Sequence, residues 1–580
     1  MVRYISARLS NFRSLLTPTF LRPGETYSFD DFKADFFAGI TVAVIQVPQS
    51  MALALIAGLP AVYGLYASLP GFIASLWGSS RQLSTGPVAI VSFLTFASLV
   101  PLAEPGSSDF IHLAATLALL TGLIYLIMGL FRLDFVLQLV PHSVVVGFSS
   151  AAASIIVLSQ LPTLLGLALT QRDLVADSVI DIILNLPNIS LITAAVGAAT
   201  LLLLFVSRRL PRTFPAAFVV LVSGAGIGYL LNFGELGVSL VKTVPESLPM
   251  FALPFLSTHT FFSLLPKAAI IALVGFVGTH ASAKTAAAKT KEQLNTNQEL
   301  VGQGLANVVT AFFQGFPLSG SFTRTAVNVE AGGRTPIAAV VTTVFTVITL
   351  LFFTPLFYTL PRAVLAGIVI FSALPLINIK SLRDMYHISK MDGLVAFLTF
   401  AMACILKPDD AIFIGVVAAL MLFIRQTVWG IRVLEMGIDE RWNILRGVRE
   451  EFDEHLVSTF KDVCVVRIGA ALYYANSLHI CELLDEVIRA HTQREKDTLK
   501  KLVIDASGIN FIDITAIEVM GEYISRLEER GIRTYTIYLR RGVKETIERA
   551  PHFPKFTILH NIAEMRHKCL LIAQPKSETA

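Results

Sequence analysis

Residues 320–327 read Gly320-Ser321-Phe322-Thr323-Arg324-Thr325-Ala326-Val327, a polar interruption within a long series of apolar segments. A second interruption, Ser84-Thr85-Gly86-Pro87, lies at a similar place in the first half of the chain. Broken helices at corresponding positions of two halves are the sequence pattern that marks the central binding site of a membrane transporter. Glycine and proline also kink ordinary membrane helices, but two matching interruptions favour a binding site.

The chain around these interruptions has the composition of a membrane protein. Hydrophobic residues make up 54% of its 580 residues and charged residues 15%, well below the roughly 25% of a soluble domain. A spanning helix needs about 20 mainly apolar residues. The sequence predicts about thirteen such runs, at residues 38–59, 63–79, 86–103, 110–131, 135–158, 189–207, 214–231, 264–283, 299–316, 336–357, 361–376, 391–406 and 409–428.

The distribution of charge divides the chain, because charged residues are sparse up to about residue 432 and frequent beyond it. Arg208, Arg209 and Arg212 indicate a cytosolic loop by the positive-inside rule. We expect a multi-pass protein of the cell (inner) membrane with both termini in the cytosol. The expected parts are a cytosolic N-terminal segment (1–36), membrane repeat 1 (37–232), a polar connection (233–263), membrane repeat 2 (264–432) and a cytosolic linker with a soluble domain (433–580).

The polar tail is predicted to be a small α/β domain. Expected strands at 463–468, 502–505 and 534–539 alternate with expected helices at 477–490, 514–530 and 543–550. This alternation implies strands that are at least partly parallel. Ligands and partners often bind at strand-to-helix turns, although such turns are equally often structural. The turn residues with this potential are Asp505, Ser507, Asp513 and Thr515.

The two interruptions have the chemistry of an anion site. Helix N-termini offer free N–H groups and a positive dipole end, so they attract an anion without a desolvated charge. The hydroxyls of Thr85, Ser321 and Thr323 add donors, and Pro87 suits the first turn of a helix. Arg324 is an ionisable residue inside a membrane segment, which is a functional hypothesis by default. The alternative is that Arg324 extends to a lipid headgroup from a helix end.

Candidates for coupling to a second ion are few. His280 and Lys284 lie four residues apart and therefore share a helix face, either along an anion path or at the cytosolic end of that helix. The helix at 264–283 contains no acidic residue, because none occurs between Glu246 and Glu292. Glu299 is the nearest acidic candidate, and it also suits a structural role at a helix start.

Several function classes are disfavoured by the sequence. It contains no phosphate-binding loop and no signature of a hydrolase or metalloprotease, so neither an enzyme nor a cofactor is expected. The four cysteines form no CxxC pair, which argues against a metal site or a disulfide framework. The formal net charge of +4 is too small to suggest nucleic acid as a partner.

The chain resembles the SulP family of anion permeases, which carry a C-terminal STAS domain. The resemblance spans nearly the whole chain and is most specific at 60–68 (Pro-Ala-Val-Tyr-Gly-Leu-Tyr-Ala-Ser) and at 78–81 (Gly-Ser-Ser-Arg). Further matching stretches are 47–52, 84–87, 297–300 and 320–328, and in the tail 502–508 and 511–513.

The resemblance implies an all-α membrane bundle of about fourteen segments, in two inverted repeats of seven, followed by the small α/β STAS domain. The thirteen apolar runs agree with fourteen segments if a further short helix, near 323–330, is too short to stand out as an apolar run. The family's anion site lies between its third and tenth segments, and its members are usually homodimers. The positions that correspond to this site are Gln49, Leu53, Thr85, Gly86, Pro87, Val88, Ser321, Thr323 and Arg324.

Three positions depart from the family pattern. Leu53 replaces a residue that is often aromatic. Gly278 stands where many proton-coupled relatives carry a glutamate, which puts proton symport by that route in doubt. Ile514, followed by Thr515, replaces the serine that is phosphorylated in stand-alone STAS proteins.

We therefore predict a secondary active transporter of a small inorganic anion, with sulfate as the leading substrate. The alternatives are a bicarbonate transporter, a chloride or other anion exchanger, and an uncoupled channel-like pathway. A membrane-tethered regulator whose STAS domain binds a cytosolic protein is the remaining hypothesis.

Overall fold

The computed structural model describes most of the chain, and it divides into two compact units, residues 1–419 and 420–580. The described residues are 18, 27–139, 141–167, 175–211, 214–241, 247–254, 257–406, 408–439, 444–447, 457–458, 460–495, 499–550 and 557–570. Each unit is described separately below.

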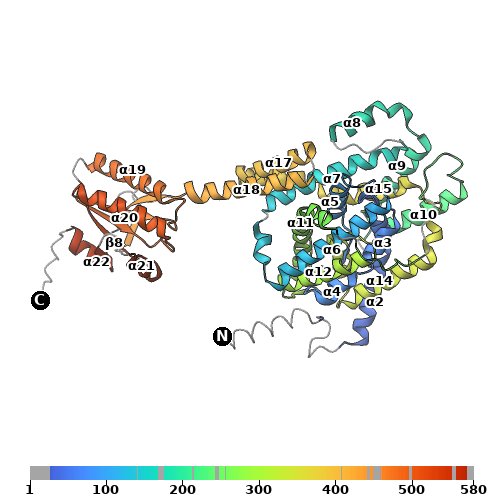
Figure 1. Ribbon diagram of the computed structural model, residues 1–580, viewed down its shortest axis with the longest axis horizontal. Helices are drawn as coiled ribbons and strands as arrows, with labels where there is room; N and C mark the ends of the chain where they lie inside the picture. The colour runs from blue at the N-terminus through green and yellow to red at the C-terminus, as the bar shows by residue number, and fades with distance from the viewer. Residues whose placement is uncertain are drawn as a thin grey trace. The chain divides into compact units, whose positions relative to one another are not determined.

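The first unit is helical (Figure 1). Its first half contains α2 (Phe29–Ile56), α3 (Val62–Ser68), α4 (Gly71–Trp77), α5 (Ala89–Leu99), α6 (Ser108–Leu130), α7 (His142–Leu165), α8 (Val175–Leu184), α9 (Leu191–Ser207) and α10 (Ala216–Leu230). Its second half contains α11 (Thr258–Thr290), α12 (Thr296–Phe312), α13 (Phe322–Glu330), α14 (Ile337–Ile348), α15 (Arg362–Ala373), α16 (Ile379–Ile388) and α17 (Lys390–Ile405). The last helix, α18 (Pro408–Trp429), leads from the first unit into the second.

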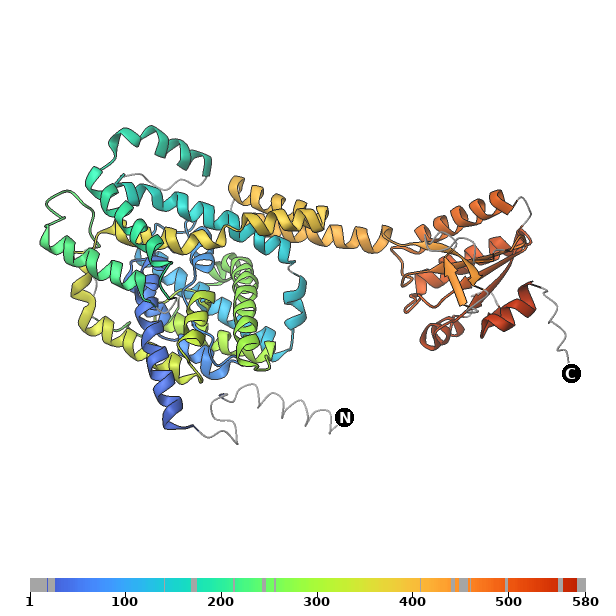
Figure 2. The same cartoon turned by 180° about the vertical axis from the view of Figure 1, so that it is seen from behind.

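Among the described residues, six helices are long and apolar enough to cross a membrane, and others are shorter apolar helices of 10–17 residues. Helix α13 is the short helix that the predicted runs had missed. The run at 63–79 is split into α3 and α4, and α8 and α16 lie outside the predicted runs. Both views place α8 at the edge of this unit (Figures 1 and 2).

Small residues allow the central helices to pack closely. Helix α12 lies along α6, and a Cβ added at Gly122 would come within 2.8 Å of the Val308 nitrogen. A Cβ at Gly304 would come within 2.9 Å of the Leu126 nitrogen. Close backbone approach at small residues is how membrane helices gain packing energy without a hydrophobic driving force.

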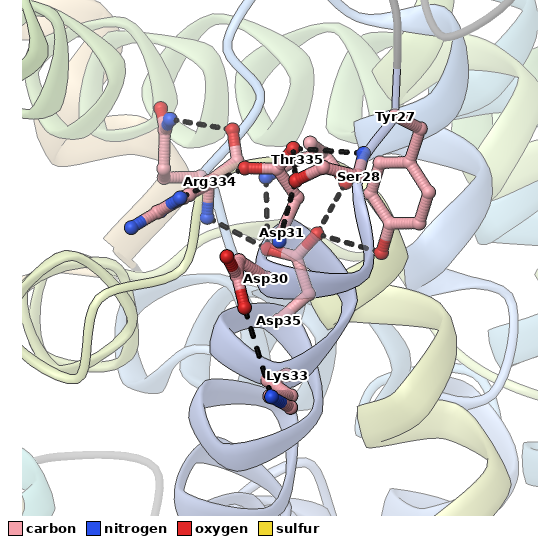
Figure 3. Close-up of polar contacts among 9 residues, drawn as sticks. Tyr27, Ser28, Asp30, Asp31, Lys33, Asp35, Arg334 and Thr335 are labelled. Atoms are coloured by element: carbon pink, nitrogen blue, oxygen red, sulfur yellow. Dashed lines mark hydrogen bonds and ion pairs between the residues drawn. The ribbon is translucent and has the colours of Figure 1, made fainter.

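The start of α2 is joined to the connection between α13 and α14 by a buried carboxylate. Asp35 is fully buried and accepts hydrogen bonds from the backbone N–H groups of Arg334 (2.7 Å) and Thr335 (2.9 Å). The hydroxyls of Thr335 and Tyr27 also donate to it. Asp31 pairs with the Arg334 guanidinium at 2.9 Å, and Figure 3 shows these side chains gathered at the first turns of α2. Segments about 300 residues apart in sequence are thus tied together.

The second unit is an α/β domain built on one sheet, as the sequence predicted. Strand order is β4-β3-β6-β7-β8-β9, with β5 also paired to β3. The strands β6 to β9 are parallel, whereas β3 is antiparallel to its neighbours. The strands are β3 (Val433–Asp439), β4 (Ile444–Gly447), β5 (Val457–Ser458), β6 (Val463–Ile468), β7 (Lys501–Asp505), β8 (Arg533–Ile537) and β9 (Thr557–Leu559).

Helices cover both faces of this sheet. Helices α19 (Ser477–Glu495), α20 (Ile514–Glu529) and α21 (Arg541–Glu548) pack on the face that carries Val466 and Ile504. Helix α22 (Ile562–Met565) packs on the face that carries Val465 and Val503. Because successive side chains of a strand point to opposite faces, the apolar run of β6 supplies both cores. Each fully buried aliphatic side chain contributes about 1.5–3 kcal/mol.

Candidate functional site

The two polar interruptions meet in the structure as a pair of short strands. Strand β1 (Thr85–Gly86) lies antiparallel to β2 (Ser319–Gly320), with Thr85 opposite Gly320. Helix α5 begins three residues after the end of β1, and α13 begins two residues after the end of β2. The N-termini of two half-length helices are therefore held side by side, which concentrates their positive dipole ends and free N–H groups at one place. We call β1, β2 and the first turns of α5 and α13 the β1·β2 site.

The two helix starts differ in their caps. Ser321 is the N-cap of α13, and its hydroxyl accepts a hydrogen bond from the Arg324 backbone N–H. Val88 is the N-cap of α5 and offers no side-chain cap. The expectation that Pro87 occupies the first helical turn is wrong, because extended backbone at Val88 delays the helix to Ala89. The N-terminus of α5 is consequently open to an external acceptor.

Arg324 lies behind the paired strands and does not reach outward. Its side chain is 1% exposed, Nη2 donates to the Pro87 carbonyl oxygen at 3.0 Å, and Nε donates to the Ser84 hydroxyl at 3.4 Å. In the part of the chain that the structure describes, no carboxylate pairs with this guanidinium. An unpaired buried charge is costly, and a bound anion next to it would lower that cost. The alternative of an arginine extended to a lipid headgroup does not fit this burial.

The predicted contact residues are arranged around the two helix starts. Ser321 and Thr85 are buried, whereas Thr323 and Phe322 are exposed, Phe322 by 49%. The hydroxyls of Ser321 and Thr323 lie 3.3 Å apart. The mixture of buried and accessible donors suits a site that solvent reaches from the α13 side.

Helix α2 contributes the remaining two predicted contact residues. It packs against both α5 and α13. Gln49 is half-buried and Leu53 is buried one turn further along the same face. Leu53 is smaller than the aromatic residue that is often found at this position in the family pattern, so α2 presents an aliphatic side chain here.

A row of buried polar side chains on α11 and α12 supports the paired strands, and the sequence interpretation missed it. Gln303 Nε2 donates to the Thr85 hydroxyl at 2.8 Å. Asn307 binds both backbone groups of Leu318, the residue before β2. The Thr279 hydroxyl accepts from the Gly320 N–H at 2.8 Å. The spacing of Glu299, Gln303 and Asn307, four residues apart within an apolar run, is the signal that identifies one polar helix face.

The coupling candidates have different surroundings. Glu299 is 1% exposed and accepts hydrogen bonds from the backbone N–H groups of Ser79 and Ser80, both at 3.0 Å, so it fixes the segment after α4. His280 is half-buried and stacks on Phe276, while Lys284 is exposed. A Cβ added at Gly278 would meet no atom within 4 Å, so a larger side chain fits there.

The two aspartates of the STAS turn are occupied by structural contacts. Asp505 is fully buried and accepts hydrogen bonds from Arg467 Nε at 2.6 Å and from the Ser507 N–H at 2.9 Å. Asp513 caps α20 through the Ala516 N–H and also accepts from the Tyr474 N–H. Thr515 is exposed. These contacts account for the shape of the turn only as structural bonds of the two aspartates. A regulatory role of Asp505, Ser507, Asp513 and Thr515 stays a prediction.

Among its described residues, the second unit contains one cluster that combines potential metal ligands. Ligand atoms of Glu435, Cys464 and His491 lie within 4.8 Å of one another. Arg494, however, donates to both carboxylate oxygens of Glu435, and His491 donates to one of them. Burial acts to raise the pKa of Glu435, but these hydrogen bonds outweigh it and lower the pKa to about 2. Burial also raises the pKa of the Cys464 thiol, so the cluster has the character of an ion pair.

Two family models match the chain in succession. The model of the sulfate permease family matches residues 32–399, and the model of the STAS domain matches residues 456–565. The first match contains the β1·β2 site, and the second contains most of the α/β unit.

The matched relatives are transport proteins. The chloroplastic sulfate transporter 4.1 of Arabidopsis thaliana is 31% identical over 556 residues, which cover 94% of this chain and 80% of the relative. A probable sulfate transporter of Mycobacterium tuberculosis is 29% identical over 521 residues, which cover 89% of this chain and 91% of the relative. Solute carrier family 26 member 6 of Homo sapiens is 30% identical over 468 residues, which cover 76% of this chain and 61% of the relative.

Solved structures with the same fold include two transporters. The murine anion transporter Slc26a9 in the inward-facing state has a TM-score of 0.84 at 23% identity, covering 96% of this chain and 97% of its own. The transmembrane domain of the cyanobacterial bicarbonate transporter BicA has a TM-score of 0.59 at 27% identity, covering 68% of this chain and 98% of its own. The first likeness supports the fold alone: a helical membrane bundle followed by a STAS domain.

Proposed function

Since the chain belongs to the sulfate permease family, and is therefore an anion transporter of the multi-pass membrane type, we propose that it moves sulfate by secondary active transport. The anion is held between the N-termini of α5 and α13, the third and tenth segments, and alternating access carries it across the bilayer. We further propose that the protein is a homodimer with both termini in the cytosol and the domain boundaries given above.

One observation carries the proposed mechanism. The pairing of β1 with β2 brings two helix N-termini together beside Arg324, whose buried guanidinium has no carboxylate partner among the described residues. This arrangement supplies positive potential and neutral hydrogen-bond donors, which favour an anion without binding it so tightly that it cannot be released. Donors that are fixed in advance bind an anion without a reorganisation cost, and moderate binding permits release on the other side.

The substrate residues then have separate tasks. The N–H groups at the start of α5 and the hydroxyls of Ser321 and Thr323 donate hydrogen bonds to the anion. Arg324 acts from behind the strands as a source of potential. Gln49 and Leu53 on α2 form the facing wall, where an aliphatic Leu53 widens the space available to the anion.

Uptake into proteoliposomes tests the proposal. Radiolabelled sulfate and bicarbonate are offered with and without imposed proton and sodium gradients. Saturable sulfate uptake that responds to one gradient supports a coupled sulfate permease, and absence of any saturable sulfate uptake contradicts the proposal.

An anion exchanger for bicarbonate or chloride is the second candidate. The absence of a carboxylate at Gly278, where an added Cβ would meet no atom within 4 Å, favours transport that is not coupled to protons. Uptake that ignores both gradients but is accelerated by internal anion would identify an exchanger. Uptake that neither saturates nor shows counterflow would identify a channel-like pathway.

A further inference from the structure

A cavity separate from the β1·β2 site lies where four helices approach one another. Its volume is about 400 Å³, whereas a cavity needs only about 10–15 Å³ to hold one water molecule. Leu55 of α2, Phe96 of α5, Gln160 of α7 and Arg362 of α15 contribute to its lining. We call this cavity the vestibule.

The polar lining of the vestibule is positive. Arg362 is the first residue of α15, whose N-cap Pro361 provides no side-chain cap. The exposed Arg362 side chain forms no ion pair with the described residues. Gln160 is 93% buried, and Thr163 adds a hydroxyl one turn further along α7. Glu104 precedes Pro105 of the lining in sequence, and among the described residues it forms no ion pair with Arg362.

The backbone that carries Arg362 is fixed in position. Its N–H donates to the Ser239 carbonyl oxygen at 2.9 Å, and the Val241 N–H donates to the Leu360 carbonyl oxygen at 2.9 Å. These bonds pair residues 239–241 with residues 360–362. The guanidinium is therefore presented from a rigid support, which reduces the entropy lost on binding.

The vestibule shares two helices with the β1·β2 site. Helix α5 begins at Ala89 in that site and reaches the vestibule at Phe96, about 10 Å further along at 1.5 Å per residue. Helix α2 carries Leu53 and then Leu55. Helix α2 runs from Asp35 near its start to Leu55 at the vestibule, about 30 Å further along at 1.5 Å per residue, which places the vestibule at the membrane face opposite the start of α2.

We propose that the vestibule is a second anion site, in which Arg362 captures a small inorganic oxyanion before it reaches the β1·β2 site from that face. This inference rests on the proposed function. Charged clefts with low-dielectric walls raise the local concentration of an oppositely charged substrate. The site therefore governs apparent affinity from one face of the membrane only.

Side-selective transport tests this assignment. Right-side-out and inverted membrane vesicles are prepared with the wild type, Arg362→Gln, Arg362→Lys and the control Arg383→Gln, which removes an exposed arginine on α16. We expect Arg362→Gln to raise the KM for radiolabelled sulfate about fivefold from the vestibule face, with the maximal rate from that face and the KM from the opposite face unchanged. Arg362→Lys should restore most of the affinity, and Arg383→Gln should leave both faces unchanged.

The contrary outcomes separate the two proposals. A KM that is unchanged, or raised equally from both faces, overturns the vestibule assignment while the transport function stands. Wild-type vesicles without saturable sulfate uptake contradict the proposed function instead.

Chemical labelling of a cysteine in the vestibule provides a second test. It does not depend on transport activity, so it also works if an Arg362 variant transports poorly. Thr163→Cys introduces a thiol in the vestibule, and its reaction rates with an anionic and a neutral methanethiosulfonate reagent are compared. We expect the anionic reagent to react faster, sulfate to protect the thiol, and both effects to disappear when Arg362→Gln is added. Equal rates without protection in the Thr163→Cys protein would overturn the proposal.

Discussion

Arg324 in the helical unit and Arg494 in the α/β unit both contact groups that are largely shielded from solvent, but they are satisfied in opposite ways. Arg494 is bonded to both oxygens of Glu435, so its charge is neutralised within the fold. Arg324 donates only to a carbonyl oxygen and a hydroxyl. The paired charge of Arg494 therefore serves stability. The charge of Arg324 has no counter-ion among the described residues, so its positive potential is available to attract an anion.

Replacing Arg324 is the strongest test of this difference. Arg324→Gln should reduce sulfate uptake by at least about 100-fold, because the buried source of positive potential is lost. The protein should still run as a single species in size-exclusion chromatography. Radiolabelled uptake into proteoliposomes is the measurement, with Arg383→Gln as the control. Uptake close to that of the wild type would show that Arg324 is a structural brace only.

The corresponding change at the paired charge should affect stability and not transport. Glu435→Gln should destabilise the α/β unit by about 2 kcal/mol, because a charge-assisted network is replaced by neutral contacts. Hydrogen exchange of β3 and α19 in the full-length protein measures this loss. The control is Glu545→Gln, which breaks the exposed Arg541–Glu545 pair and should cost at most about 0.5 kcal/mol. Normal protection in Glu435→Gln would contradict the assigned role of the pair.

The same pair predicts the pH dependence of the α/β unit. The pKa of Glu435 falls from 4.5 to about 2 in the folded protein, so its stabilisation is complete above pH 4.5. It is lost progressively as the pH falls from 4.5 toward 2, because only the unfolded state binds the proton readily in that range. The protection factors of the β3 amides, which are corrected for intrinsic exchange at each pH, should fall over this interval in the wild type and much less in Glu435→Gln. Parallel pH profiles of the two proteins would refute the assignment.

The smallest effect is expected at the supporting residues of the β1·β2 site. Gln303→Leu removes the donor to Thr85 and should raise the KM for sulfate about fivefold, the equivalent of one hydrogen bond of about 1 kcal/mol. The maximal rate should change little, and the exposed control Gln426→Leu should leave KM unaltered. An effect on protein yield without an effect on KM would restrict Gln303 to a packing role.

The sequence predicted helices and strands correctly wherever the pattern of apolar residues within one segment was sufficient. Strand β6 occupies the predicted residues 463–468, in which the apolar residues 463–466 follow the charged pair Lys461 and Asp462. The apolar runs likewise located most helices of the first unit. Helix α16 was missed because it is amphipathic and not uniformly apolar.

Candidate residues for the site could be chosen from the sequence more readily than their geometry. Gly, Ser and Thr in a membrane segment are conspicuous, but the strands that they form are two residues long and pair only through contacts distant in sequence. No local pattern indicates that Thr85 lies opposite Gly320, or that the backbone stays extended at Val88. The support from Gln303 and Asn307 could have been predicted from their helical spacing, whereas the contact of Arg324 with Pro87 could not.

The buried carboxylate of Asp35 has a consequence for the biogenesis of the protein. Its donors on Arg334 and Thr335 lie 299 and 300 residues later in the chain, and at translation rates of roughly 5–20 residues per second they emerge roughly 15–60 s after it. During that interval the newly made α2 carries a carboxylate whose partners Arg334 and Thr335 do not yet exist, although Tyr27 has been made. The nascent helix must keep Asp35 hydrated at the membrane surface until synthesis of the second half allows the first turns of α2 to reach their final packing.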